Sequence, residues 1–116
     1  MSDISIYHNP ACGTSRNTLA LLREKGQDPT VVEYLKVGWT RDQLHALTKA
    51  MGVGAHDILR INDARADELG LSDPAASDDA LFAAMILEPI LVNRPIVVTS
   101  KGAALCRPAE LVLSLL

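Results

Sequence analysis

Apolar and polar residues alternate at the start of the chain in the pattern of a strand, a helix and a second strand. Ile4-Ser5-Ile6-Tyr7 carries branched and aromatic side chains at alternating positions, which predicts a short strand. The segment from Thr14 to Lys25 has leucines at helical spacing, and Gly26 is well placed to end that helix. Val31-Val32-Glu33-Tyr34-Leu35 predicts a second strand. A strand, helix and strand in this order favour a parallel pair and an α/β fold.

The middle of the chain changes to helical spacing. Thr40 with Gln43 three residues later is a capping box, which predicts the start of a helix. Short helical pieces are expected at 55–59 and at 64–69, the second ended by Gly70. Ser77 can cap a further helix. Its predicted buried residues are Leu81, Phe82, Met85 and Ile86. We therefore expect a helical insertion at about 40–88.

The last part of the chain predicts a hairpin and a terminal helix. Residues 95–99 and 103–106 are two apolar segments joined by Ser100-Lys101-Gly102, which favours two antiparallel strands with a short loop. The peptide bond before Pro95 is a candidate cis bond. Pro108 suits the first position of a helix. The residues of this helix expected to face inward are Leu111, Val112 and Leu115.

The order of these elements matches a thioredoxin-like, or glutaredoxin-like, α/β sheet with an inserted helical bundle. With 116 residues, 48% of them hydrophobic, the chain can form one ordinary core, so a single domain over 1–116 is expected. The net charge of −3 gives no general attraction to nucleic acid or to an anionic membrane surface. No apolar run approaches the ~20 residues that cross a bilayer.

Cysteine content and the start of the chain indicate a reducing compartment. Two cysteines, Cys12 and Cys106, do not make the disulfide framework of a small secreted protein. Met1-Ser2-Asp3 does not resemble the beginning of a signal peptide. A cytoplasmic protein is therefore expected.

The charged residues are distributed unevenly between two neighbouring segments. Between Asn62 and Glu88, seven carboxylates face one basic residue, Arg65. A solvated helical surface is favoured over a metal site, because no His or Cys completes a ligand cluster, and no metal is expected. From 89 to 109 the chain has Arg94, Lys101 and Arg107 and no acid. Any basic site must therefore be local.

Cys12 stands where the first strand is predicted to pass into the first helix. A thiol at a helix N-terminus faces unpaired backbone N–H groups and the positive end of the helix dipole, which favour its thiolate. The same N–H groups bind oxyanions. Ser15 occupies the position three residues on, so this is not the Cys-x-x-Cys pair of a dithiol oxidoreductase, and any second thiol must come from elsewhere. Cys106 ends an apolar strand, where a packed structural thiol is the favoured interpretation.

Three arginines are candidates for binding an oxyanion beside Cys12. Each of them stands at the edge of an apolar segment: Arg60, Arg94 and Arg107. Arginine binds tetrahedral oxyanions through two parallel hydrogen bonds and would lower the pKa of a nearby thiol. His8 could stabilise the thiolate, relay a proton, or simply bond a backbone carbonyl, and these alternatives remain open.

The run from His8 to Leu19 resembles the active-site loop of the glutathione- and glutaredoxin-coupled arsenate reductases. Further matches are Ile58-Leu59-Arg60, Asn93-Arg94-Pro95-Ile96-Val97-Val98-Thr99 and Leu105-Cys106-Arg107-Pro108, so the resemblance covers nearly the whole chain. It implies a thioredoxin-like fold. It also assigns roles to single residues: Cys12 as the nucleophile, His8 and Ser15 as groups that tune its thiolate, and Arg60, Arg94, Arg107 and the loop at Gly13 and Thr14 as the binding site of the oxyanion.

The same resemblance implies a reaction and its participants. Arsenate would be reduced to arsenite through a covalent adduct on Cys12, with glutathione as co-substrate, glutaredoxin as partner and no bound cofactor. Two alternatives stay open. The chain could be a redox-sensing thioredoxin-like regulator that binds a protein partner, or a reductase of glutathione mixed disulfides. The missing second cysteine at Ser15 disfavours the regulator.

Overall fold

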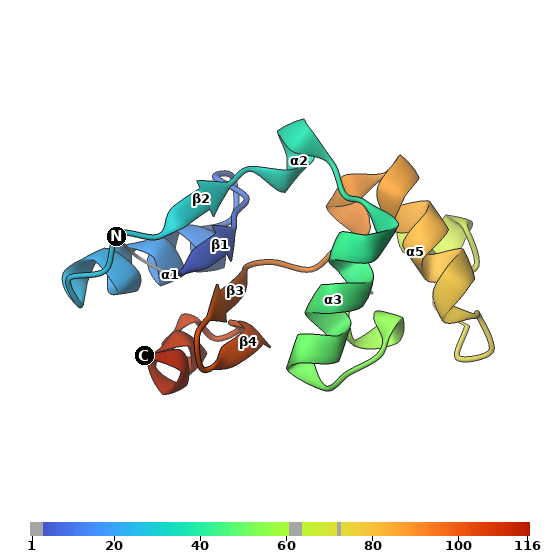
Figure 1. Cartoon of the computed structure of the whole chain (residues 1–116). Helices are drawn as coiled ribbons and strands as arrows, with labels where there is room; N and C mark the ends of the chain where they lie inside the picture. The colour runs from blue at the N-terminus through green and yellow to red at the C-terminus, as the bar shows by residue number, and fades with distance from the viewer. Residues whose placement is uncertain (1–3, 61–63, 72) are drawn as a thin grey trace. The chain divides into compact units, whose positions relative to one another are not determined.

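The computed structural model describes residues 4–60, 64–71 and 73–116, with only the backbone described at 64 and 65. The chain divides into two compact units (Figure 1). The first comprises the chain up to Val37 and again from Arg94 to Leu116, and the second is Gly38–Asn93. The predicted insertion at about 40–88 lies within the second unit. That the chain is a single domain stays a prediction.

The first unit contains a four-stranded mixed sheet in the order β2-β1-β3-β4. Its strands are β1 (Ser5–Tyr7), β2 (Thr30–Val32), β3 (Ile96–Thr99) and β4 (Gly102–Leu105). β1 runs parallel to β2 and antiparallel to β3, and β3 and β4 form the predicted hairpin. The predicted parallel pair and the α/β class are therefore confirmed.

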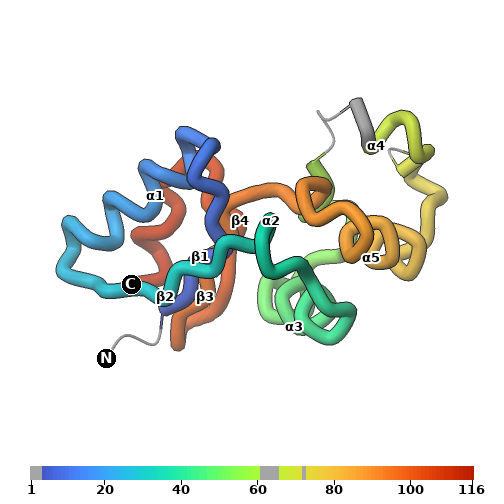
Figure 2. The backbone as a smooth tube through the Cα atoms, turned by 90° about the horizontal axis from the view of Figure 1, so that it is seen from above, coloured from blue at the N-terminus to red at the C-terminus, as the bar shows by residue number. Residues whose placement is uncertain are grey.

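Two helices cover one face of this sheet. α1 (Gly13–Glu24) and η3 (Ala109–Leu115) contact each other, and η3 also contacts β3 and β4. Figure 2 shows both helices on the same face of the strands. The Thr99 hydroxyl donates to the carbonyl oxygen of Leu115 at 2.8 Å and so ties the end of η3 to β3. The buried core between the two layers consists of Ile4, Ile6, Leu19, Leu22, Val97, Cys106, Val112 and Leu115.

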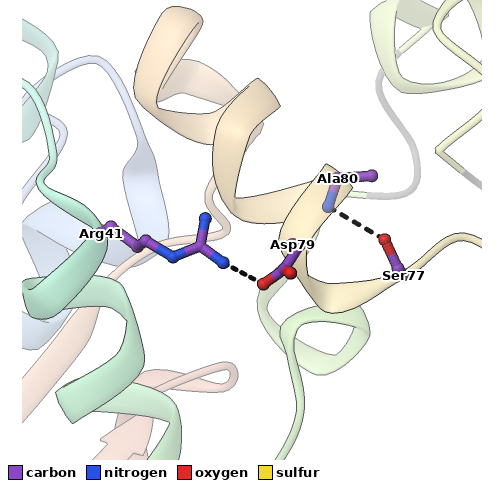
Figure 3. Close-up of polar contacts among 4 residues, drawn as sticks. All are labelled: Arg41, Ser77, Asp79 and Ala80. Atoms are coloured by element: carbon purple, nitrogen blue, oxygen red, sulfur yellow. Dashed lines mark hydrogen bonds and ion pairs between the residues drawn. The ribbon is translucent and has the colours of Figure 1, made fainter.

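The second unit is helical. It consists of α3 (Arg41–Met51), η1 (Ala55–Ile58), α4 (Ala64–Glu68), α5 (Asp78–Leu87) and η2 (Pro89–Leu91). Thr40 and Gln43 form the predicted capping box of α3, and Ser77 caps α5 by accepting from the amide of Ala80. Arg41 at the start of α3 forms an ion pair with Asp79 at the start of α5 (Figure 3). Within the described residues, no helix is long and apolar enough to cross a membrane.

The second predicted strand is shorter than expected. Val31 and Val32 pair with β1, but Tyr34 and Leu35 belong to a short helix, α2 (Tyr34–Val37). The amide of His8 makes the last hydrogen bond to this strand, at the carbonyl oxygen of Val32. Because β1 ends at that point, the chain beyond Val32 has no strand to pair with, and its alternating pattern does not keep it extended.

Two residues predicted to be buried are exposed. Leu111 is 46% exposed because the terminal helix η3 is a 3-10 helix with three residues per turn. Its buried residues follow that period of three, at Ala109, Val112 and Leu115. Ile86 is 37% exposed, since α5 buries the side formed by Leu81, Phe82 and Met85.

Two cis peptide bonds precede prolines of the first unit. The predicted bond between Arg94 and Pro95 is cis, and so is the bond between Arg107 and Pro108, which the sequence did not single out.

One of the seven carboxylates predicted to form a solvated helical surface, Asp63, lies outside the described residues. Among the residues that are described, no group of three or more His, Cys, Asp or Glu side chains is arranged to hold a metal.

Candidate active site

Cys12 lies at one end of the sheet, where strand topology gathers it with two arginines. It is the N-cap residue of α1 and follows β1 through a short loop. Arg94 precedes β3, and Arg107 follows β4. The final residue of β1 pairs with the first of β3, which pairs with the last of β4, so these three connections leave the sheet at the same end. Arg94 and Arg107 therefore lie close to Cys12, although they are 82 and 95 positions away from it in the sequence.

Arg107 contacts the Cys12 sulfur directly. Its Nη1 donates to Cys12 Sγ at 3.6 Å and to the carbonyl oxygen of Arg94 at 3.0 Å. The second bond fixes the guanidinium group over the thiol. The Arg94 side chain also hydrogen-bonds the sulfur and adds its own positive charge. Two guanidinium groups therefore face one sulfur, while the binding of an oxyanion by Arg94 and Arg107 stays a prediction.

The pKa of the Cys12 thiol results from opposing influences. Burial raises the pKa, since the side chain is only 8% exposed. The backbone amide of Ser15 and the side chains of Arg107 and Arg94 donate hydrogen bonds to the sulfur and lower it. The donors outweigh burial and bring the pKa of Cys12 down to about 7. Much more of this thiol is therefore ionised at neutral pH than of an ordinary cysteine.

His8 and Ser15 form a buried pair behind the thiol. His8 Nδ1 lies 2.6 Å from Ser15 Oγ, and the amide of Asn9 donates to the same oxygen at 3.0 Å. Burial lowers the pKa of His8, as do Arg23 and Arg16, against an opposing effect of Glu33. Ser15 Oγ already accepts from the amide of Asn9. Its hydroxyl proton is therefore available to Nδ1 of a neutral His8, which accepts it. The partner of His8 Nδ1 is thus the hydroxyl of Ser15.

The loop between β1 and Cys12 has most of its backbone groups bonded. The amide of Cys12 donates to the carbonyl oxygen of Asn9, and the amide of Ala11 donates to Asn9 Oδ1, both at 3.0 Å. Arg16 Nη1 donates to the carbonyl oxygen of Pro10 at 2.8 Å. The sequence pattern alone assigns no role to Asn9 or to Arg16. An Asn two residues before an amide it can bond is the local signal for such a turn.

The remaining candidates lie in different parts of the molecule. Gly13 and Thr14 are the first two residues of α1, whose amides have no acceptor inside the helix. Arg60 lies in the second unit, just after Leu59, and its amide donates to the carbonyl oxygen of Leu91 at 2.8 Å. The participation of Arg60 in an anion site with Cys12 stays a prediction.

Cys106 has a different environment from Cys12. It follows β4, is fully buried in the core and points its thiol at the carbonyl oxygen of Ala104 at 3.7 Å. Burial raises its pKa to about 11, and no basic side chain contributes to that shift. Its thiol stays protonated at neutral pH, which fits the structural role favoured by the sequence.

Comparison with known proteins places this geometry in a family. Residues 7–115 match the model of the ArsC family. The chain is 52% identical over 116 residues to an arsenate reductase of Escherichia coli (strain K12). This match covers 100% of the chain and 82% of the relative. It is also 52% identical over 113 residues to an arsenate reductase of Rhizobium meliloti (strain 1021), a match that covers 97% of the chain and 81% of that relative.

A solved structure agrees with these sequence matches. An arsenate reductase from Vibrio cholerae superimposes with a TM-score of 0.94 at 42% identity, over 99% of this chain and 98% of that one. The predicted thioredoxin-like α/β sheet is confirmed by this match. The family match and these relatives lead to one conclusion: the chain belongs to the ArsC family.

Proposed function

We propose that this protein reduces arsenate to arsenite, with the Cys12 thiolate as nucleophile. The observation that carries the proposal is the contact of the Cys12 sulfur with two guanidinium groups, whose hydrogen bonds help to lower the pKa of the thiol. Positive charge around an attacking sulfur lets it approach an anion that would otherwise repel it. The names of the relatives from Escherichia coli and Vibrio cholerae support arsenate as that anion.

In the proposed complex, arsenate is bound by arginine side chains and by helix amides. Arg94 and Arg107 donate paired hydrogen bonds to its oxygens, and the free amides of Gly13 and Thr14 add donors at the positive end of α1. Arg60 is proposed as the third arginine. This set neutralises a dianion without a metal. Phosphate has nearly the same shape and charge and is expected to compete for the site.

The proposed chemistry begins with a covalent adduct. The Cys12 thiolate attacks arsenic(V), a sulfur–arsenic bond forms, and one arsenate oxygen takes up protons and leaves as water. Glutathione then supplies the second thiol. Its sulfur bonds to Cys12 Sγ, the electron pair of the sulfur–arsenic bond passes to arsenic, and arsenite leaves as the trivalent product. Two thiols thus lose the two electrons that arsenic gains.

The resulting disulfide between Cys12 and glutathione has to be reduced by a thiol from outside the chain. Glutaredoxin is the proposed partner, and its thiolate takes the glutathione and returns the Cys12 thiolate. Cys106 is unsuited to this step because burial holds the pKa of its thiol at about 11. Ser15, three residues from Cys12, carries no sulfur. Since glutathione and glutaredoxin act in reducing surroundings, we propose a cytoplasmic location.

His8 and Ser15 are proposed to hold the thiolate in position. The Ser15 amide bonds the sulfur while its hydroxyl is held by His8 and by the amide of Asn9. Because burial lowers its pKa, His8 is expected to act as a neutral partner of Ser15 and not as a cation beside the sulfur.

The test is a coupled assay with arsenate, glutathione, glutaredoxin, glutathione reductase and NADPH. We expect NADPH oxidation that depends on arsenate, on glutathione and on glutaredoxin, and that phosphate inhibits competitively. A control reaction replaces arsenate with a glutathione mixed disulfide. Turnover of the mixed disulfide without any turnover of arsenate would overturn the proposal in favour of a disulfide reductase. Absence of both, with Cys12 still reactive to iodoacetamide, would favour the regulator.

A further inference from the structure

The backbone of Asn9 hydrogen-bonds both to Cys12 and to Ser15, the residue whose amide contacts the Cys12 sulfur. The carbonyl oxygen of Asn9 accepts from the amide of Cys12, and its own amide donates to Ser15 Oγ, both at 3.0 Å. Ser15 in turn donates its amide to the Cys12 sulfur. The backbone of Asn9 therefore connects the residue that carries the thiol with the residue that stabilises the thiolate.

The Asn9 side chain holds this backbone in place. Its Oδ1 accepts from the amide of Ala11 at 3.0 Å, which closes a turn over Pro10. Asn9 is only 6% exposed, and a polar group at that depth is costly unless it is bonded. Pro10 has a fixed φ and no N–H, so it cannot offer a competing bond that would close the loop differently.

We propose that Asn9 is a positioning residue of this site: its side chain closes the turn that sets the Cys12 sulfur against the Ser15 amide and the Arg107 guanidinium. The turn also uses two loop amides, those of Ala11 and Cys12, so they are not donors to a bound oxyanion. The donors left to the anion are the amides of α1 and the arginines. Asn9 acts through Cys12 and touches no reacting atom.

The test replaces Asn9 and follows the Cys12 thiol without any arsenate, so its result is independent of the proposed reduction. Asn9→Ala removes one partly buried hydrogen bond, and we expect the pKa of Cys12 to rise from about 7 by roughly one unit. The rate of iodoacetamide alkylation at pH 7 should then fall about fivefold, as the thiolate fraction falls. Asn9→Ser keeps an oxygen that can accept from the amide two residues on, and should restore most of the rate.

Asp73→Ala is the matched control. Asp73 Oδ1 accepts from the amide of Ala75 at 2.9 Å, which is the same side-chain turn in the second unit. This variant should leave the pKa and the alkylation rate of Cys12 unchanged. An Asn9→Ala protein that loses thermal stability while its Cys12 pKa stays at about 7 would show a purely structural residue and overturn the proposal.

A measurement on the unaltered protein decides the case if Asn9→Ala does not fold. Hydrogen exchange should find the amide of Ala11 protected, since it is bonded to Asn9 Oδ1. Exchange of Ala11 as fast as that of an open loop would contradict the proposed turn. Asn9→Ser should keep most of the protection of Ala11 and most of the alkylation rate of Cys12, and a variant that loses this protection while Cys12 is alkylated as before would contradict the proposal.

Discussion

The loop around Cys12 and the core around Cys106 place the same side chain in two environments within one unit. Both thiols are buried, at 8% and 0% exposure, and burial raises the pKa of both. Only Cys12 has an amide and two guanidinium groups directed at its sulfur, and its pKa falls to about 7 while that of Cys106 rises to about 11. Hydrogen-bond donors, and not exposure, therefore distinguish the cysteine that we propose as the nucleophile from the structural one.

The largest effect on turnover should come from removing the Cys12 sulfur, and removal of the Cys106 sulfur should leave turnover unchanged. Cys12→Ser should lower the arsenate-dependent rate of the coupled assay by at least about a thousandfold, because a serine hydroxyl is far less nucleophilic than a thiolate at neutral pH. Cys106→Ala should keep the rate and lower the free energy of unfolding by roughly 1 kcal/mol, through loss of core packing. An equal loss of turnover in both variants would mean that Cys106 takes part in the reaction.

A smaller effect is expected when a donor to the sulfur is removed. Arg107→Ala should raise the pKa of Cys12 by roughly one unit, since it deletes both a hydrogen bond and a nearby charge. Arg107→Lys should raise it less, because a point charge remains. Thiol titration of Arg23→Ala, which changes an exposed arginine on α1, is the control. Equal shifts in Arg23→Ala and Arg107→Ala would point to a general field in place of a local contact.

The contributions of the two cysteines to the free energy of unfolding should depend on pH in opposite directions. The folded-state pKa of Cys12 is lowered, so its contribution is complete above the ordinary thiol pKa of about 8.5 and is lost as pH falls through about 7. The folded-state pKa of Cys106 is raised, so its contribution is present below about 8.5 and is lost as pH rises through about 11.

Urea unfolding from pH 6 to 10 under reducing conditions checks these signs. The stability difference between the unaltered protein and Cys12→Ser should grow between about pH 7 and pH 8.5, while the difference to Cys106→Ala should fall only above about pH 8.5. Parallel curves for the two variants would contradict the assignment of the two environments.

The smallest effect on the thiol is expected from the second unit. Thr40→Ala removes the capping box of α3 and should lower the free energy of unfolding by about 1 kcal/mol. Thr40→Ser keeps the hydroxyl and should restore most of that loss. The pKa of Cys12 should be the same in all three proteins. A changed pKa would show that the cap of α3 influences the thiol.

Local signals in the sequence predicted most of the elements. The start of α3 at Thr40 and the start of α5 at Ser77 depend on side chains that bond amides three residues away, so the pattern can be read in a short window. Gly26 follows α1 with a φ of 81°, as its position at the end of the helix predicted. The position of Cys12 directly before a helix was predicted for the same reason, and its role as nucleophile stays a prediction.

The wrong predictions depended on features beyond such a window. Tyr34 left the second strand because its partner β1 ends early, and Leu111 turned outward because the last helix has a period of three. The bonds of Asn9 to Cys12 and Ser15 depend on the folded path of the loop, which the residue types alone do not fix. The contact of Arg107 with the sulfur required the hairpin of β3 and β4 to return to the end of β1.

The most direct test of the account alkylates both cysteines of the folded protein in one sample and reads each site by mass spectrometry across a pH series. The alkylation rate of Cys12 should reach half of its maximum at a pH near 7. Below about pH 9, Cys106 should be modified only after the protein has been unfolded. A Cys12 profile centred at the ordinary thiol pKa of about 8.5, or equal labelling of the two cysteines, would contradict the claim that directed donors make one buried thiol reactive.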